Sequence, residues 1–290
     1  MDKCAPGKDF KDGSCFSKKE LSTITLALNQ NTNSKIDINQ QKKDLVEDLE
    51  KKFNKEYGCT DQKCWLSQKF IKRLGNDEIS KYTFRPKGPS GKYSWLSTTN
   101  INEVIEQYEK KHDDFMYLGT VPYDFEDLDD LGIKDLNLRK TQNDGINKLG
   151  MVINLDYHYQ SGSHWVALYT DLKKNQIYFF DSFAKKPRKK IKKFINRLTK
   201  YLYKKNYNDD LDINNVLKKL EGGGKSNQID NLKKFDIKYN NIQHQFKNSE
   251  CGVYSINFII RLAKGEGFDS ITKDIMKDDE MNLCREVYFN

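Results

Sequence analysis

The chain has 290 residues, enough for one large domain or two smaller ones, and carries a net charge of +8. Hydrophobic residues make up 37% of it, below the roughly 45–50% of typical globular domains. Aromatic residues, at 12%, still provide for a core. The apolar runs are shorter than the ~20 residues that span a bilayer, so we exclude a membrane-spanning helix.

The first residues, 1–6, lack the apolar stretch of a signal peptide, so we expect a protein that stays in a reducing compartment. Its six cysteines are then expected to be thiols and not disulfides. A four-thiolate zinc site of Cys4, Cys15, Cys59 and Cys64 is the alternative, because the spacing of the last two suits zinc. The longer spacing of the first two disfavours it, and we expect neither a metal nor another cofactor.

Three amphipathic helices are predicted before residue 85, over residues 17–31, 41–57 and 64–74. Ser17 and Glu20 have the spacing of a capping box at the start of the first helix. Gly58 stops the second. We therefore expect a small helical domain over residues 1–85, acting as a folding or docking arm.

A stretch rich in proline and glycine, residues 86–92, is predicted to be a linker to a second domain over residues 93–290. That domain should begin with a helix over residues 99–111. An acidic and aromatic stretch over residues 115–131 and a strand over residues 149–155 are expected to follow.

Two strands, over residues 166–170 and 176–180, are predicted to form a hairpin. His164 precedes the first strand and Asp181 follows the second. Because a hairpin reverses direction, the start of one strand lies beside the end of the next. We therefore expect the carboxylate of Asp181 to hold the imidazole of His164 in one tautomer.

The densest basic run follows the hairpin and includes Lys185, Lys186, Arg188, Lys189 and Lys190. It leads into an amphipathic helix, so a solvated helix face is the first interpretation. A patch that contacts the phosphates of a nucleic acid is the second, and the positive net charge leaves it open.

Cys251 stands at the predicted start of a buried helix. Unpaired N–H groups and the positive end of the helix dipole favour a thiolate there. Gly252 leaves room for a substrate carbonyl, and Gln245 can offer its side-chain N–H to a developing oxyanion. A lone Cys-Gly pair is more often structural. Together with His164 and Asp181 it predicts a covalent cysteine nucleophile.

His158 and His244 are the other candidates for the base, and Asp171 is the other candidate for the acid. His158 has no matching acid in the sequence, and His244 is close to Cys251 in the chain. Asp171 lies at the far end of the His164 strand, roughly 17–20 Å away when extended. We expect His164 and Asp181 to act.

These residues resemble the adenovirus-type cysteine proteases, which include the SUMO-deconjugating proteases. The resemblance lies in His164, Trp165, Asp181, Gln245 and residues 249–254. It extends to residues 95–102, where Ser97 and Thr98 replace the usual Asn-Asp pair. The chain is more similar still to the polyprotein-processing proteases of African swine fever virus and other large DNA viruses, through segments around Cys15 and Cys59.

The resemblance implies an α+β fold with a central mixed sheet flanked by helices, against which the Cys251 helix packs. It implies a viral endopeptidase that cleaves after Gly-Gly in structural polyproteins during virion maturation. Trp95 and Trp165 would close over the substrate as a tunnel that admits only glycine, which has no β-carbon. The protein would act in the host cytoplasm and the virion and would not be secreted.

Three alternatives remain open from the sequence. The first is a deconjugase that removes SUMO or another ubiquitin-like protein from host conjugates. The second is an acetyltransferase of the same fold, which uses a similar histidine, acid and cysteine. The third is an inactive module that binds ubiquitin-like proteins, which the intact set of His164, Asp181 and Cys251 disfavours.

Overall fold

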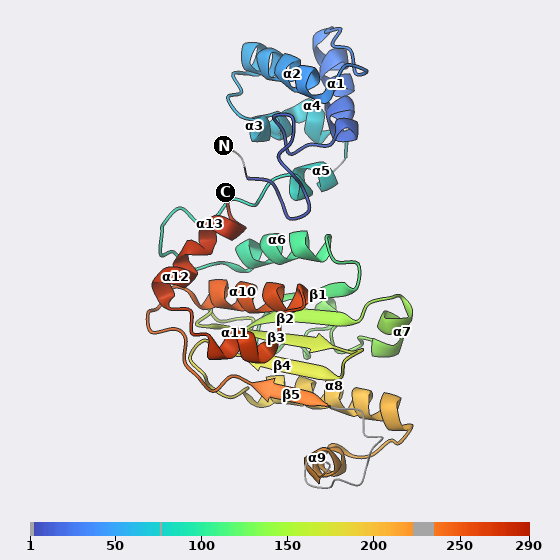
Figure 1. The fold of residues 1–290 in the computed structure, drawn as a ribbon, viewed down its shortest axis with the longest axis vertical. Coiled ribbons are helices and arrows are strands. Elements are labelled where there is room, and N and C mark those ends of the chain that lie inside the picture. Colours follow the sequence, from blue (N-terminus) through green and yellow to red (C-terminus); the bar gives the residue numbers. More distant parts are fainter. Residues whose placement is uncertain (1–2, 76, 223–234) are drawn as a thin grey trace. The chain divides into compact units, whose positions relative to one another are not determined.

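The computed structural model describes residues 3–75, 77–222 and 235–290 (Figure 1). The chain divides into two compact units, one of residues 1–88 with 286–290 and one of residues 89–285. The last five residues therefore group with the first unit, whereas the sequence analysis assigned them to the second. The N–H of Asn290 donates to the carbonyl of Pro86 at 3.0 Å, and Phe289 packs against Gly88.

The first unit is helical, as predicted. Its helices are α1 Lys18–Thr32, α2 Lys42–Tyr57, α3 Gln62–Ser67, α4 Lys69–Lys72 and α5 Asp77–Tyr82. The capping box of Ser17 and Glu20 is present. The single helix predicted over residues 64–74 is broken in two, because Gln68 is extended and its amide donates to the carbonyl of Cys64. Phe16, Phe53 and Trp65 stack in the core.

Two disulfides overturn the prediction of six thiols. Cys4 bonds to Cys15 and Cys59 to Cys64, with Cα–Cα distances of 5.4 and 5.5 Å. The zinc alternative fails for the same reason, since no thiolate of the four remains. The prediction rested on the compartment, whereas the pairing follows from a fold that brings each pair within the 4.4–6.8 Å that a disulfide spans. Among the described residues, no cluster of His, Cys, Asp and Glu side chains could hold a metal.

The second unit contains a mixed five-stranded sheet, so the α+β prediction is confirmed. Its strands are β1 Phe115–Val121, β2 Lys148–Asn154, β3 Trp165–Asp171, β4 Gln176–Phe180 and β5 Asp236–Tyr239, in that order across the sheet. The outer pairs, β1 with β2 and β4 with β5, are parallel. The inner pairs, β2 with β3 and β3 with β4, are antiparallel, and β3 and β4 form the predicted hairpin.

Strand β1 was not expected from the sequence, which indicated only an acidic and aromatic stretch. Gly119 has a φ of +100°, and the register with β2 shifts between Tyr117 and Thr120. This β-bulge interrupts the alternation of inward and outward side chains that identifies a strand in a sequence.

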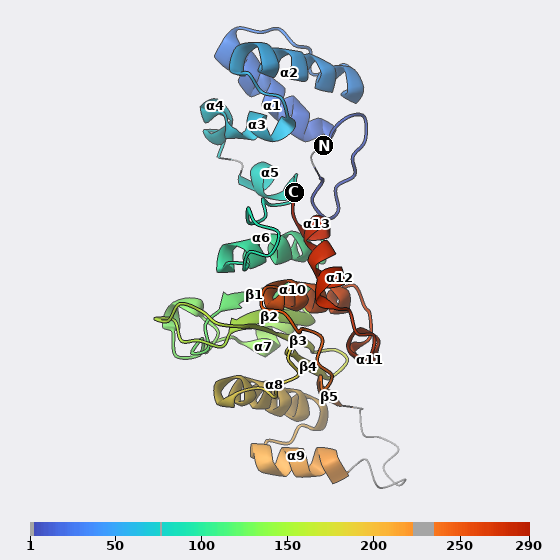
Figure 2. The ribbon, with the colours of Figure 1, turned by 90° about the vertical axis from the view of Figure 1, so that its left-hand side faces the viewer.

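Helices cover both faces of this sheet (Figures 1 and 2). The helices after the first five are α6 Thr98–Glu109, α7 Leu138–Asn143, α8 Lys189–Tyr207, α9 Ile213–Gly222, α10 Cys251–Ala263, α11 Phe268–Lys273, α12 Asp278–Leu283 and α13 Arg285–Tyr288, with a short 3₁₀ helix at Asp129–Leu131. Of these, α13 belongs to the first unit apart from Arg285, and α9 packs on α8. Helix α10 packs on β3 between the sheet and α6, whereas α8 lies on the opposite face. Within the described ranges, no helix has the length and apolarity needed to cross a membrane.

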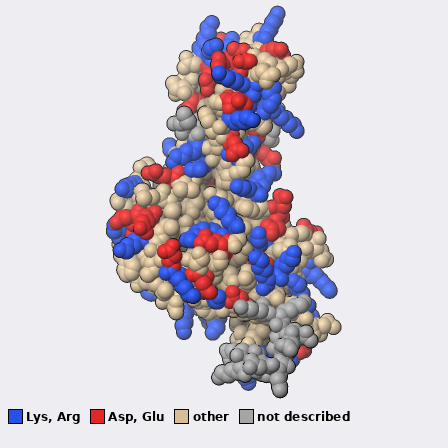
Figure 3. All heavy atoms as spheres, viewed as in Figure 1, with Lys and Arg blue, Asp and Glu red and all other residues tan. Residues whose placement is uncertain are grey.

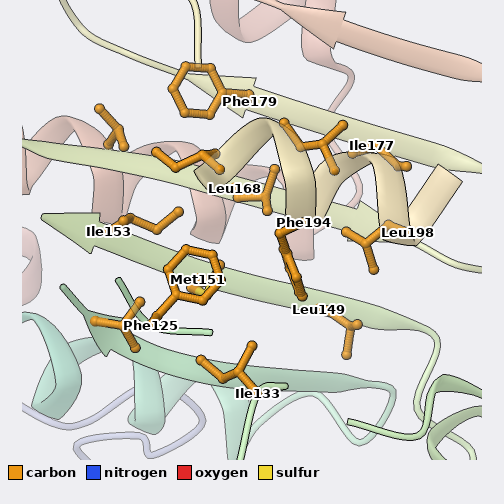
Figure 4. Close-up of a cluster of buried hydrophobic side chains, with 14 of the residues drawn as sticks. Phe125, Ile133, Leu149, Met151, Ile153, Leu168, Ile177, Phe179, Phe194 and Leu198 are labelled. Atoms are coloured by element: carbon orange, nitrogen blue, oxygen red, sulfur yellow. The ribbon is translucent and has the colours of Figure 1, made fainter. Parts of the chain in front are cut away.

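A core cluster fills the space between the sheet and α8 (Figure 4). Met151, Leu168 and Ile177 point from three neighbouring strands toward Phe194 and Leu198 of α8. Each fully buried side chain of this kind contributes about 1.5–3 kcal/mol relative to exposure. Helix α8 is the helix predicted after the basic run, and its apolar face packs against the sheet.

We predict that Gly150→Ala destabilises the protein by about 1–3 kcal/mol through overpacking. A Cβ at Gly150 would lie 2.8 Å from the ring of Phe115 on one side and 3.0 Å from Cγ2 of Ile259 on the other. Urea unfolding of the full chain measures the change. Gly267→Ala is the control, because a Cβ there would meet no atom within 4 Å. Equal stability of the two variants would contradict the packing described here.

Candidate active site

The register of β3 and β4 brings His164 and Asp181 together. Ala167 pairs with Phe180, so the residues before β3 and after β4 meet at one edge of the sheet. The Nε2 atom of His164 lies 2.7 Å from Oδ1 of Asp181. Asp181 is only 1% exposed, and its backbone is held by two hydrogen bonds with the side chain of Asn240. The geometry expected from the hairpin is therefore present.

Cys251 is the second hydrogen-bonding partner of the His164 side chain. Burial by itself lowers the pKa of His164, but hydrogen bonds to Asp181 and Cys251 outweigh it and raise this pKa to about 9. Because Nε2 faces Asp181, Nδ1 is the ring nitrogen left for the sulfur. At neutral pH the ring is thus an imidazolium beside a cysteine, the arrangement of an activated nucleophile.

Cys251 is the first residue of α10 and is 5% exposed. The residue before it, Glu250, places no side-chain acceptor on the N-terminal N–H groups of the helix. The next residue, Gly252, packs closely against its neighbours, and its expected role beside the substrate carbonyl stays a prediction. A Cβ at Gly252 would lie 3.1 Å from Cβ of Leu96 and 3.3 Å from Cδ1 of Trp165. Glycine is needed there for close packing, and this geometry does not single out a path for the substrate carbonyl.

Gln245 lies six residues before Cys251 in the chain and is buried. Its Oε1 accepts from the hydroxyl of Ser182 at 2.6 Å, and its Nε2 donates to the carbonyl of Lys247 at 2.7 Å. These bonds fix the amide and use one of its two N–H groups. Donation by the second N–H to an oxyanion stays a prediction.

A groove of about 620 Å³ runs past Cys251. Trp95, Leu96 and Trp165 are among the residues that line it. Trp95 is 55% exposed, so it is not a core residue. The indole N–H of Trp165 donates to the carbonyl of Leu96 at 3.0 Å, so this ring is held in place. The lining also includes Pro122, Asn154, Asp156, Tyr157, His158 and residues 160–163.

His158 has an acid partner that the sequence analysis did not find. Its Nδ1 lies 2.6 Å from Oδ2 of buried Asp124, and its backbone N–H donates to Oδ1 of the same residue. Burial tends to raise the pKa of Asp124, but the bonds from His158 bring it below its usual value. The acid lies in the stretch over residues 115–131, whose course the sequence did not reveal. His158 lines the groove, but the hydrogen bond to Cys251 is made by His164.

The remaining candidates lie elsewhere. His244 is buried and its Nε2 faces the carbonyl of Thr272 at 3.1 Å; burial lowers its pKa. Asp171 accepts the backbone N–H groups of Lys173 and Lys174, which closes the turn between β3 and β4 at the opposite end of the hairpin. Neither is brought to Cys251.

Three residues that the sequence analysis missed hold the loop before Cys251. Asp278 accepts the backbone N–H groups of Phe246 and Lys247, at 2.8 and 3.1 Å. Asn282 and Arg285 bind the carboxylate of Glu250. Asp278 and Asn282 are four residues apart on α12, the spacing of one helix face, and this is the signal that could have found them; Arg285 begins α13.

The basic run is partly neutralised. Lys190 pairs with Asp127, and Arg197 lies 2.9 Å from Glu126. Arg188 donates to the carbonyl of Leu155. Lys185, Lys186 and Lys189 are exposed. Acidic and basic side chains are interspersed over the face seen in Figure 3. Nucleic-acid binding by this run stays a prediction.

Comparison with known proteins agrees with this geometry. A family model for the C-terminal catalytic domain of the Ulp1 protease family matches residues 138–289. A protein of Acanthamoeba polyphaga mimivirus, named as a thiol protease, is 32% identical and covers 100% of this chain and 93% of its own length. A protein of African swine fever virus, named as a SUMO-1 cysteine protease, is 24% identical and covers 99% of this chain and 94% of its own length.

A solved structure shares the fold. The crystal structure of a protease of African swine fever virus superposes with a TM-score of 0.62 at 20% identity, covering 86% of this chain and 90% of the other.

We predict that His164→Ala lowers kcat by about 10²–10⁴-fold, because His164 moves the proton. His158→Ala should change kcat by less than about tenfold and act mainly on KM, because His158 lines the groove without bonding to Cys251. Steady-state kinetics of both variants measures this difference. A larger loss of kcat in His158→Ala than in His164→Ala would exchange their roles.

We predict that kcat/KM falls above about pH 9, where His164, whose pKa is raised to about 9, loses its proton. The same proton stabilises the fold below pH 6.5, and this contribution is lost as the pH rises through about 9. Asp181→Asn removes the charge that raises this pKa and leaves burial, which lowers it. The alkaline limb of the pH–rate profile should therefore move to lower pH. Asp171→Asn is the control and should leave the limb in place.

Proposed function

This chain belongs to the Ulp1 family of cysteine proteases, and we propose that it is a viral endopeptidase that cleaves structural polyproteins after Gly-Gly during virion maturation. The observation that carries the proposal is the single line of contacts from Asp181 through His164 to Cys251 beside an open groove. The names of the viral relatives support the viral setting.

In the proposed mechanism the thiolate of Cys251 attacks the scissile carbonyl carbon, and the carbonyl oxygen becomes an oxyanion. The N–H of Cys251 and the second amide N–H of Gln245 donate to it. His164 gives its proton to the leaving amine as the C–N bond breaks, which leaves a thioester. His164 then takes a proton from water, the hydroxide attacks the thioester, and the C–S bond breaks. Asp181 holds the ring through both steps.

Glycine before the cut follows from the two tryptophans. Trp165 is fixed by its bond to Leu96 and lies against Gly252, beside the nucleophile. Trp95 lines the same groove and is exposed, so its ring is available to close over a bound chain. Two indole faces so close to the sulfur leave little volume for a β-carbon.

We place this activity in the host cytoplasm at virus assembly sites and in the virion. The viral relatives support that setting. Disulfides persist in oxidising surroundings, so the bonds of Cys4–Cys15 and Cys59–Cys64 favour the virion of the two.

Removal of a ubiquitin-like protein from host conjugates is the second candidate. The names of the African swine fever virus relatives as SUMO-1 cysteine proteases favour it. It requires the same chemistry and the same glycine preference. The two functions differ in whether the folded ubiquitin-like protein, beyond its Gly-Gly end, improves cleavage.

We predict that the purified chain cleaves a peptide library best after Gly-Gly and that Trp95→Ala relaxes this preference while lowering kcat/KM, because a wider slot positions the carbonyl less well. The library varies the two residues before the cut, and a SUMO fusion ending in Gly-Gly is assayed beside it. Tyr159→Ala is the matched control, since Tyr159 is an exposed aromatic that does not line the groove.

Cys251→Ala provides the blank and should lose activity by several powers of ten. Efficient cutting after Ala-Leu by the native chain would end the glycine proposal. A SUMO fusion cut far faster than the matching peptide would favour deconjugation. Cleavage by Cys251→Ala at the native rate would end the protease proposal as argued here.

A further inference from the structure

The residue before the nucleophile is an acid in an unusual situation. Glu250 is the N-cap of α10, where an acidic side chain ordinarily accepts the first N–H groups of the helix. It accepts none of them. Its side chain is 1% exposed and turns instead to Arg285, whose Nε donates to Oε2 at 2.9 Å and whose Nη2 donates to Oε1 at 3.2 Å. Asn282 and Ser249 donate to Oε1 as well, at 3.0 and 2.8 Å.

This arrangement determines where a buried negative charge lies. A carboxylate that loses its cation in a buried place seeks other donors or takes up a proton. The donors nearest in the chain are the N–H groups in the first turn of α10, which have no partner within the helix. If Glu250 capped them, its charge would lie beside Cys251, and these N–H groups would be lost to an oxyanion.

We propose that Arg285 is a positioning residue that holds the carboxylate of Glu250 away from the N-terminus of α10 and so keeps that end positive for Cys251. The proposal rests on the proposed function in one respect, that Cys251 is the nucleophile. The pH dependence of Cys251 reactivity is also set by the charged groups that face Cys251 and Glu250. His164, backed by Asp181, faces Cys251, and Arg285 faces Glu250. Burial raises the pKa of the Cys284 thiol, and the charge of Glu250 adds to this increase.

The loop does not depend on Arg285 alone. Asp278 holds the backbone of Phe246 and Lys247, and Gln245 is held by Ser182. Changing Arg285 therefore removes the partner of Glu250 while other contacts keep the loop in place. This separates an electrostatic role from a purely structural one.

The test compares the full-length chain with Arg285→Met, Glu250→Gln and the double variant. Alkylation of Cys251 by iodoacetamide is followed against pH by peptide mapping, and kcat and KM are measured on a Gly-Gly peptide. Arg285→Met should slow alkylation at neutral pH about tenfold, equivalent to one pH unit, with its profile moved to higher pH. Its kcat should fall by a similar factor with little change in KM. Glu250→Gln has no charge to release and should alkylate at least as fast as the native chain.

The double variant decides the matter. With glutamine at position 250 no charge is released, so alkylation and kcat should return close to those of Glu250→Gln. If the double variant is as slow as Arg285→Met, or if the profile of Arg285→Met does not move, the pair only supports the loop and the proposal fails. Should Arg285→Met not fold, Arg285→Lys replaces it, because an ammonium holds the carboxylate by one contact instead of two. The alkylation profile of Arg285→Lys should then move to higher pH by less than that expected for Arg285→Met. Adding Glu250→Gln to Arg285→Lys must remove this shift, and a shift that persists overturns the proposal.

Alkylation needs no substrate, so the two proposals fail separately. A native chain whose Cys251 alkylates as expected but which cleaves no peptide would refute the proposed function and leave the role of Arg285 intact.

Discussion

The complete burial of helix α10 is the constraint on which the site depends. Every residue of α10 except Arg261 is buried, and an apolar helix of this kind must be covered on all sides. Strand β3 covers one side and α6 and α12 contribute to the others. Since the helix cannot slide or turn within this packing, its first residue, Cys251, has one position relative to the start of β3. The sulfur is placed by the core beneath it.

The second constraint is the register of the sheet. A slip of one residue between β3 and β4 would turn their side chains to the opposite faces, so the buried faces of both strands fix the pairing. The pairing in turn fixes the distance between His164 and Asp181. A second histidine, His158, lines the groove and is equally close to an acid of its own, Asp124. Both pairs consist of a histidine and an aspartate, so residue type does not distinguish them. The hydrogen bond to Cys251, which His164 makes, does.

Two buried carboxylates, Asp181 and Glu250, determine the electrostatic surroundings of the Cys251 sulfur. On one side the interactions of His164 with Asp181 and Cys251 outweigh its burial and raise its pKa to about 9. On the other, Arg285 occupies the carboxylate of Glu250 with a cation. Both carboxylates are nearly inaccessible to water, where charges interact more strongly than at the surface. The site therefore depends on which partner each buried acid has, and a change of partner alters the chemistry without altering the fold.

The sequence alone determined the local features: the capping box at Ser17, the hairpin that carries His164 and Asp181, and the apolar helix that begins at Cys251. These follow from periodicity and spacing within one or two elements, which a sequence displays directly. It did not determine the strand β1, the disulfides, the acid beside His158 or the hold of Arg285 on Glu250. Strand β1 contains a bulge that breaks the pattern, and the partners of His158 and Glu250 are distant in the chain. The disulfides join cysteines only 11 and 5 residues apart, but spacing alone does not show whether two cysteines come within bonding distance. Only tertiary packing decides such pairings, because many partners satisfy the same local pattern and the fold admits one of them.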